Sequence, residues 1–228
     1  MSFDALKALD VMLTLQDRMN CTVTPEWVNK DFNWHDAVWV ECAELLDQLG
    51  YKWWKFKQVD IEAARMEVVD IYHFMLSIVI ESGIHPAYYI SKAGLSVFNT
   101  QESIPAAKIL TRELASHYTS KCKTVLDSAN PEEFNIFMSL CGSLGMTYEE
   151  LYERYIGKNA LNIFRQNNGY KDGTYEKVWG GREDNEYASE FVKLVFDNKD
   201  IPTEDKFDEI YHMLDNNYQC IVLGAVHD

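Results

Sequence analysis

Basic residues are scarce in this sequence: 21 Lys and Arg stand against 36 Asp and Glu, which gives a formal net charge of −15. A chain this acidic is a poor general binder of nucleic acids or anionic membranes, because phosphate backbones attract clustered Lys and Arg. We therefore expect no nucleic acid and no membrane among its partners. If the protein binds phosphate groups, a metal ion or one local basic patch has to supply the positive charge.

Long apolar runs and leader segments are missing as well. The longest apolar run lies near residues 71–80 and contains His73, so it is too short to span a bilayer. The first residues, M-S-F-D-A-L-K, lack the basic and apolar segments of a secretory signal. The five cysteines form no C-x-x-C pair, and their odd number argues against a closed disulfide framework. These absences together predict a cytoplasmic protein.

Several common catalytic signatures are absent. The sequence has no G-x-S-x-G, no G-x-x-x-x-G-K-[ST], no G-x-G-x-x-G after a strand and no H-E-x-x-H. It also has no alternating strand pattern bounded by turn signals and no internal repeat of about 20–50 residues. No familiar site for nucleophilic, P-loop, dinucleotide or zinc chemistry therefore competes with the interpretation that follows.

What the sequence does contain is helical periodicity over most of its length. In the N-terminal part we predict three helices, over residues 3–19, 34–49 and 60–82. A noisier helical pattern, interrupted by Gly and Pro, follows over residues 87–156. A further helix starts at Gly157 and ends at Asn168-Gly169, and residues 180–185 are expected to form a loop. The pattern predicts an all-α protein.

Two carboxylate pairs stand inside apolar helical segments: Glu41 with Glu44, and Glu67 with Asp70. Each pair has i, i+3 spacing, which makes its members neighbours on one helix face with Cβ atoms about 5–6 Å apart. If the two helices packed face to face, four carboxylates would share one pocket and would require a cation among them. Oxygen ligands favour Mg²⁺ or Mn²⁺. The alternative is an ordinary solvated acidic face.

A local basic face lies later in the chain. Lys158, Asn162 and Arg165 share one face of the predicted helix, and five of the 21 basic residues lie between Lys158 and Arg182. Lys and Arg clustered in this way suit oxyanions such as phosphate. A solvated basic face in an acidic protein is the alternative.

Five motifs occur in a recognisable order. They are E-C-A-E-L-L-D from Glu41, K-W-W-K from Lys52, E-V-V-D-I-Y-H-F from Glu67, G-K-N-A-L-N-I-F-R-Q-N-N-G-Y-K-D-G-T-Y from Gly157 and E-D-N from Glu183. In this order they resemble the dimeric all-α dUTPases found in Campylobacter-type bacteria and trypanosomatids, which belong to the all-α NTP pyrophosphatase superfamily. The late motif K-N-x-L-N-x-F-R-Q-x-x-G-Y is the most specific. The resemblance covers residues 3–82 and 150–190 and is weak over residues 87–147.

The resemblance implies a helical bundle of the all-α NTP pyrophosphatase type. It implies a single domain over residues 1–228, with a core of 1–86 and 148–228 and a helical insertion or cover over about 87–147. It further implies a homodimeric dUTP diphosphatase that hydrolyses dUTP, and also dUDP, to dUMP with a Mg²⁺-activated water, Mn²⁺ being an alternative ion. Two other functions stay open: a pyrophosphatase of the same fold for dCTP or another dNTP, and a non-catalytic helical binding protein.

The resemblance also assigns roles to individual residues. The metal ligands are Glu41, Glu44, Glu67 and Asp70, and Glu44 is also the catalytic residue that deprotonates the attacking water. The residues expected near the phosphates are Lys158, Arg165, Tyr170, Lys171 and Lys177. The residues expected near the nucleoside, some of them across the dimer, are Gln16, Asn20, Trp54, His73, Asn162 and Asn185.

Overall fold

The computed structural model describes residues 3–83, 100–119 and 131–224. These residues are mostly helical, which confirms the all-α prediction. The only strands among them are β1 (Val178–Trp179) and β2 (Arg182–Glu183), which pair as an antiparallel hairpin. The chain divides into two compact units, Met1–Asp17 with Glu26–Leu151, and Arg18–Pro25 with Tyr152–Asp228. The single domain with an insertion over residues 87–147 stays a prediction.

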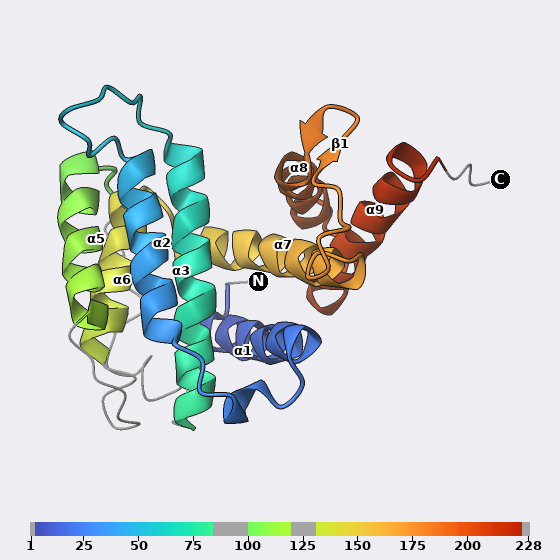
Figure 1. Cartoon of the computed structure of the whole chain (residues 1–228), viewed down its shortest axis with the longest axis horizontal. Coiled ribbons are helices and arrows are strands. Elements are labelled where there is room, and N and C mark those ends of the chain that lie inside the picture. The colour runs from blue at the N-terminus through green and yellow to red at the C-terminus, as the bar shows by residue number, and fades with distance from the viewer. Residues whose placement is uncertain (1–2, 84–99, 120–130, 225–228) are drawn as a thin grey trace. The chain divides into compact units, whose positions relative to one another are not determined.

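A bundle of helices forms most of the first unit (Figure 1). Its elements, with the parts of α1 and α7 that belong to it, are α1 (Ala5–Val23), η1 (Trp27–Asn29), α2 (Trp34–Gln48), α3 (Ile61–Ser82), α5 (Ile104–Thr119), α6 (Pro131–Ser143) and α7 (Tyr148–Asn167). Helix α2 packs against both α3 and α5, and α5 packs against α6. Helices α5 and α6 lie within residues 87–147, the region predicted to be an insertion or cover. They therefore form part of the same bundle as α2 and α3.

The bounds of α2 and α3 agree with the sequence prediction because both helices begin at clear capping residues. The Asn33 side chain accepts a hydrogen bond from the backbone N–H of Asp36, and the Asp60 side chain accepts one from that of Ala63. Such caps satisfy N–H groups that have no partner inside the helix. Helix α3 ends at Gly83, whose φ of 65° is a left-handed conformation that favours glycine.

Helix α1 is longer than predicted, since it ends at Val23 rather than near residue 19. The polar residues of its last turn resemble a loop in composition, but they continue the helical hydrogen bonding. Thr22 Oγ1 donates to the Arg18 carbonyl oxygen at 2.9 Å, and the Thr24 N–H donates to the Asn20 carbonyl oxygen at 2.8 Å. Pro25 then follows, and a proline disfavours helical conformation in the residue before it.

Aromatic packing holds α3 to its neighbours in the first unit. Tyr72 lies stacked on Phe137 of α6, with ring centroids 5.0 Å apart, and its hydroxyl lies 3.1 Å from that of Tyr148 at the start of α7. The Arg65 guanidinium donates two hydrogen bonds to the carbonyl oxygen of Leu144, just after α6. These contacts fix α3, which carries two of the four predicted metal ligands.

The second unit contains most of α7, the β hairpin, α8 (Asp184–Asp197), η2 (Thr203–Asp205) and α9 (Lys206–Ile221). Phe164 of α7 is fully buried and makes edge contacts with Trp179, Tyr211 and Tyr218. Gly157 brings α7 and α8 close together, because a Cβ at this position would overlap Cγ2 of Val192. The prediction of a loop over residues 180–185 was wrong at 182–185, which form β2 and the start of α8.

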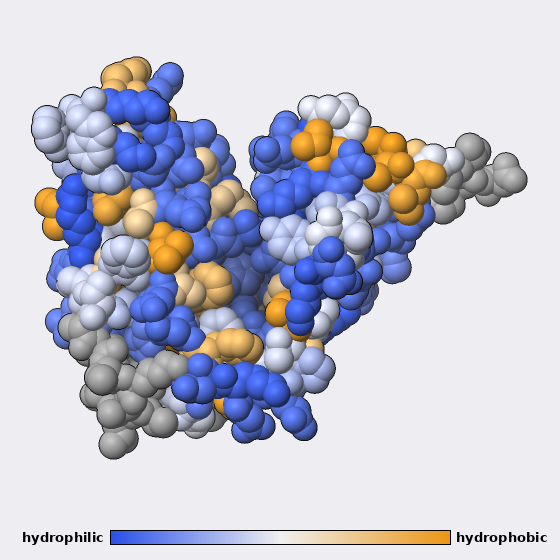
Figure 2. Space-filling model, viewed as in Figure 1, coloured by the Kyte–Doolittle hydropathy of each residue, from blue (hydrophilic) through white to orange (hydrophobic). Residues whose placement is uncertain are grey.

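Figure 2 shows hydrophilic residues over most of the visible face of each unit, with hydrophobic residues gathered in smaller patches. No helix in the described ranges is long and apolar enough to cross a membrane.

Candidate metal centre and basic face

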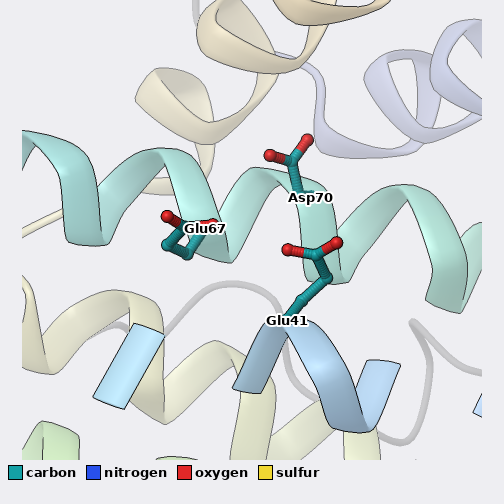
Figure 3. Close-up of side chains that lie close together, drawn as sticks. All are labelled: Glu41, Glu67 and Asp70. Atoms are coloured by element: carbon teal, nitrogen blue, oxygen red, sulfur yellow. The ribbon is translucent and has the colours of Figure 1, made fainter. Parts of the chain in front are cut away.

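Three of the four predicted metal ligands come together in the first unit. Glu41 of α2, Glu67 of α3 and Asp70 of α3 each offer a carboxylate oxygen, and these three atoms all lie within 4.8 Å of one another. Figure 3 shows Glu41 reaching from α2 toward α3, where Glu67 and Asp70 stand one turn apart. All three residues are half-buried. The packing of α2 on α3 thus converts two separate sequence motifs into one acidic group.

Glu44 does not belong to this group of three. It stands one turn after Glu41 on α2, and its side chain is exposed. Its roles as a metal ligand and as the catalytic residue therefore stay predictions.

The donor set of the three-acid group fits a hard divalent cation. All of its donors are carboxylate oxygens, and three carboxylates held within one small volume repel one another unless a cation shares it. Mg²⁺ prefers oxygen ligands and keeps several waters, so it needs few carboxylates from the protein. Exposed acidic groups are common without an ion, but partial burial reduces the screening by water that makes such groups tolerable.

The surroundings of the acidic group on α2 are only partly as the sequence indicated. Val38, Cys42 and Leu45 are fully buried, whereas Trp39 and Val40 are exposed by 46% and 43%. The expectation that apolar neighbours enclose the acids is therefore wrong on one side of α2, where large apolar side chains face outward. Burial, followed by the negative charge of Glu41, raises the pKa of the Cys42 thiol to about 12.

The loop after α2 folds back on the end of that helix. Lys52 forms an ion pair with Asp47, and Lys57 Nζ donates to Asp47 Oδ2 at 2.8 Å. Hydrogen bonds from Lys52 and then Lys57 lower the pKa of Asp47 from its ordinary value of 3.8 to about 2. The same loop exposes Trp53 and Phe56 almost completely. This anchoring brings the K-W-W-K motif close to the helix that carries Glu41.

Gln48 connects this loop to the acidic group. Lys57 Nζ donates to Gln48 Oε1 at 3.0 Å, and Gln48 Nε2 donates to Glu67 Oε1 at 3.3 Å. Gln48 was not among the residues predicted for the site. Its position next to Asp47, directly after the E-C-A-E-L-L-D motif, was the only available signal, and a glutamine at a helix end is too common to be informative.

Three of the predicted nucleoside residues lie in the first unit. Gln16 is buried on α1 and its Nε2 donates to Ser77 Oγ at 3.1 Å, while Ser77 Oγ donates to the His73 carbonyl oxygen at 3.0 Å. His73 Nδ1 lies 2.8 Å from the Val69 carbonyl oxygen, which can only accept, so Nδ1 carries the proton. The structure thus brings Gln16 and His73 together around Ser77. Trp54 is exposed in the loop after α2 and contacts Tyr51 and Trp53 edge-on.

Arg165 is the centre of the basic face in the second unit, and it is buried in an ion pair. Its Nε donates to Asp184 Oδ2 at 2.8 Å and its Nη2 donates to Asp184 Oδ1 at 2.7 Å. Tyr175 donates its hydroxyl to the same carboxylate, and Asn185 Oδ1 accepts a longer bond of 3.4 Å from Arg165. Burial opposes the charge on Arg165, but the bonds to Asp184 outweigh it, and the net effect raises the pKa of the guanidinium.

The remaining predicted phosphate residues also belong to the second unit. Two cations lie near the Tyr170 ring, with Arg165 Cζ at 5.6 Å and Lys177 Nζ at 5.2 Å from its centroid. Lys171 Nζ donates to the Val23 carbonyl oxygen at 2.9 Å. Three more predicted site residues belong to this unit: Lys158 and Asn162, both half-buried on α7, and Asn20, buried near the end of α1.

Asp184 is the residue at this site that the sequence analysis missed. It lies within the E-D-N motif, of which only Asn185 was assigned a role. A buried acid is seldom stable unless it is paired, but in a chain with 36 Asp and Glu no local feature distinguished Asp184 from its acidic neighbour Glu183. The structure adds Asp184 as the counter-ion of Arg165.

Comparison with known protein families agrees with the resemblance seen in the sequence motifs. A family model described as dUTPase matches residues 8–170. The chain belongs to the dUTPase family. The protein is therefore a dUTP diphosphatase, an enzyme that acts on a nucleotide substrate. No curated protein matches the chain.

The matched range of the dUTPase family contains some of the predicted site residues and not others. It includes the three-acid group and Arg165, and it runs through residues 87–147, where the motif resemblance was weak. It ends before Lys171, Lys177 and Asn185. The acidic group of this dUTPase can hold a divalent metal ion.

Proposed function

We propose that this dUTPase hydrolyses dUTP, and also dUDP, to dUMP with a Mg²⁺-activated water. The observation that carries the proposal is the convergence of Glu41, Glu67 and Asp70 to within 4.8 Å in a member of the dUTPase family. Mn²⁺ would serve as an alternative ion, since it has similar ligand preferences.

The acidic residues would hold the metal. When bound, Mg²⁺ neutralises charge on phosphate oxygens and lowers the pKa of a bound water. Glu44, exposed one turn along α2, is our candidate for the base that takes the proton of the attacking water. Its exposure supports the proposal, because a general base must reach a water that is supplied with substrate.

The basic residues of the second unit would receive the negative charge of the phosphates. The candidates are Lys158, Arg165, Tyr170, Lys171 and Lys177. Asp184 holds the Arg165 guanidinium in a fixed orientation. A guanidinium held in this way would bind a phosphate in one defined direction, unlike a mobile lysine.

Recognition of the nucleoside would depend mainly on amide side chains. The candidates are Gln16, Asn20, Trp54, His73, Asn162 and Asn185. An amide both donates and accepts, so it can pair with O4 and N3–H of uracil and leave the amino group of cytosine unpaired. The burial of Gln16 and Asn20 supports this assignment, because buried polar pairs discriminate most strongly.

We also propose that the enzyme is a homodimer in the cytoplasm. The exposure of Trp39 and Val40 beside Glu41 supports the dimer, since large apolar side chains on a helix face are typical of contact surfaces. Light scattering coupled to size exclusion tests it. A monomer at working concentration would reject the dimer and leave the hydrolytic proposal standing.

The deciding experiment measures product release from dUTP, dUDP, dCTP, dTTP and UTP, each with Mg²⁺ and with EDTA. We expect Mg²⁺-dependent turnover of dUTP and dUDP and much slower turnover of the other three. Glu67→Gln is expected to abolish it, and Glu62→Gln, an exposed acid on the same helix, is the matched control. Equal turnover of dCTP would reject uracil selection, and turnover in EDTA would reject the metal.

A further inference from the structure

We infer that Gln48 is a positioning residue for Glu67, and that Lys57 fixes the orientation of the Gln48 amide. Gln48 ends α2, while Glu67 stands on α3, so the bond between them crosses the helix interface beside the acidic group. This inference rests on the proposed function, because it takes Glu67 to be a metal ligand.

The direction of the Gln48 amide follows from the chemistry of Lys57. A lysine ammonium has three donors and no acceptor, so the group that it contacts on Gln48 must be the carbonyl oxygen. Lys57 Nζ lies 3.0 Å from Gln48 Oε1. The amide nitrogen then faces the Glu67 carboxylate, which it reaches at 3.3 Å. Without Lys57 the amide could rotate and present its oxygen to the carboxylate, which would repel it.

A neutral amide suits this position better than a cation. A lysine in direct contact with Glu67 would neutralise the carboxylate and compete with a metal ion for it. Gln48 instead donates one hydrogen bond and leaves the carboxylate charge in place, while the charge of Lys57 stays on the far side of the amide. Hydrogen bonds of this kind to a metal-ligating group fix its orientation and tune its affinity.

Lys57 is itself held in place by the fold of the loop. Its ammonium also donates to Asp47 Oδ2 at 2.8 Å, and the backbone N–H of Asp60 donates to the Gln48 carbonyl oxygen at 3.1 Å. Gly50 allows the close return of the chain, since its φ is 65° and a Cβ there would lie 2.8 Å from the Lys57 carbonyl oxygen. The loop that carries the exposed aromatic residues thus ends against the side chain that orients Glu67.

The chain offers a matched control for this relay. Lys52 and Lys57 both pair with Asp47, but of these two lysines of the described loop only Lys57 also donates to Gln48. We would compare Gln48→Met, Lys57→Met, Lys52→Met and the conservative Lys57→Arg in the full-length protein. The readout is the Mg²⁺ dissociation constant from calorimetry in the absence of nucleotide, with the melting temperature of each metal-free variant recorded to confirm folding.

We expect Gln48→Met and Lys57→Met each to weaken Mg²⁺ binding about tenfold or more. Losses of this size are typical when a residue that hydrogen-bonds a metal-coordinating side chain is removed. The double variant should lose no more Mg²⁺ affinity than either single variant, because each change breaks the same chain of hydrogen bonds from Lys57 through Gln48 to Glu67. Lys52→Met should bind Mg²⁺ like the wild type, and Lys57→Arg should restore most of the affinity. If Gln48→Met does not fold, Lys57→Met provides the same test.

Two outcomes would overturn the inference alone: wild-type affinity in Gln48→Met, or a loss in Lys52→Met equal to that in Lys57→Met. In either case hydrolysis of dUTP by the wild-type enzyme would still support the proposed function. Failure of the wild-type protein to bind Mg²⁺ at all would overturn the inference and also the metal dependence of the proposed function.

Discussion

Arg165 and Asp184 form a two-point ion pair that is buried on both sides, with N–O distances of 2.8 and 2.7 Å. Asp184 comes 19 residues later in the sequence and accepts a third hydrogen bond from the Tyr175 hydroxyl. The pair therefore joins α7, the turn after it and the start of α8. Arg165, a residue of the motif K-N-x-L-N-x-F-R-Q-x-x-G-Y, therefore also stabilises the fold of the second unit.

Replacement of Asp184 by Asn should destabilise the protein strongly. The change keeps the size of the side chain but leaves the buried Arg165 charge uncompensated, and breaking a buried pair in this way costs about 3–5 kcal/mol. Urea denaturation of wild type and variant measures the difference. Arg182→Ala is the matched control, because it breaks an exposed ion pair to Glu190 in the same unit and should change stability little. Equal losses would show that burial does not govern these pairs.

Mg²⁺ should raise the melting temperature of the wild-type enzyme. A ligand that binds only the folded state stabilises it by about 2.7 kcal/mol at a concentration 100 times its dissociation constant. Glu67→Gln and Asp70→Asn should abolish this rise, since each removes one of three clustered carboxylates. Differential scanning fluorimetry with and without Mg²⁺ measures it. Glu62→Gln should retain the rise, and its loss there would indicate a nonspecific charge effect.

Gly157→Ala should destabilise the second unit, although alanine favours helices by about 1 kcal/mol over glycine. The new methyl group would overlap Val192 Cγ2 of the neighbouring helix, and such overpacking costs about 1–3 kcal/mol. Val192→Ala combined with Gly157→Ala should recover much of the loss by making room. Thermal unfolding of the two variants and the wild type tests this, and a stabilised Gly157→Ala single variant would contradict the close packing.

The carboxyl group of Asp47 should resist protonation on acidification. Hydrogen bonds from Lys52 and Lys57 lower its pKa from 3.8 to about 2. A lowered pKa stabilises the folded state above about pH 4, and this contribution disappears as the pH falls toward 2. The ¹³C carboxyl signal of Asp47 should therefore stay constant from pH 7 down to about pH 3.

Lys52→Met provides the check on this titration. Because the bond from Lys52 is the largest cause of the shift, its removal should move the Asp47 midpoint upward, toward 3.8. An unchanged midpoint would show that the ion pair with Lys52 does not form in solution.

The spacing within α2 predicted a carboxylate next to α3, but it did not indicate that Glu41 rather than Glu44 joins Glu67 and Asp70 in the three-acid group. Spacing of i, i+3 places Glu41 and Glu44 on neighbouring parts of one face, but successive turns are about 5.4 Å apart along the helix axis. Which of the two faces α3 depends on the crossing angle and the axial register of the helices. Both are properties of tertiary packing, so a pattern within one helix does not contain them.

Other parts of the structure escaped prediction for related reasons. The final turn of α1 has loop-like composition, and two-residue strands such as Val178–Trp179 are too short to show alternation. The start of α8 carried a usable signal, since Glu183 and Glu186 form a capping box. The pairing of Arg165 with Asp184 needs the turn between them to close, and no local pattern reports such a closure.

The glycine at the start of the late motif has a meaning separate from that of its neighbours. Gly157 has no side chain, so Val192 of α8 can approach α7 closely there, whereas Arg165 is held by its hydrogen bonds to Asp184. One short motif therefore meets two independent requirements. It sets the distance between α7 and α8, and it sets which polar side chains α7 presents. A protein that kept the charges and lost the glycine would preserve the signature while altering the spacing of the helices that present it.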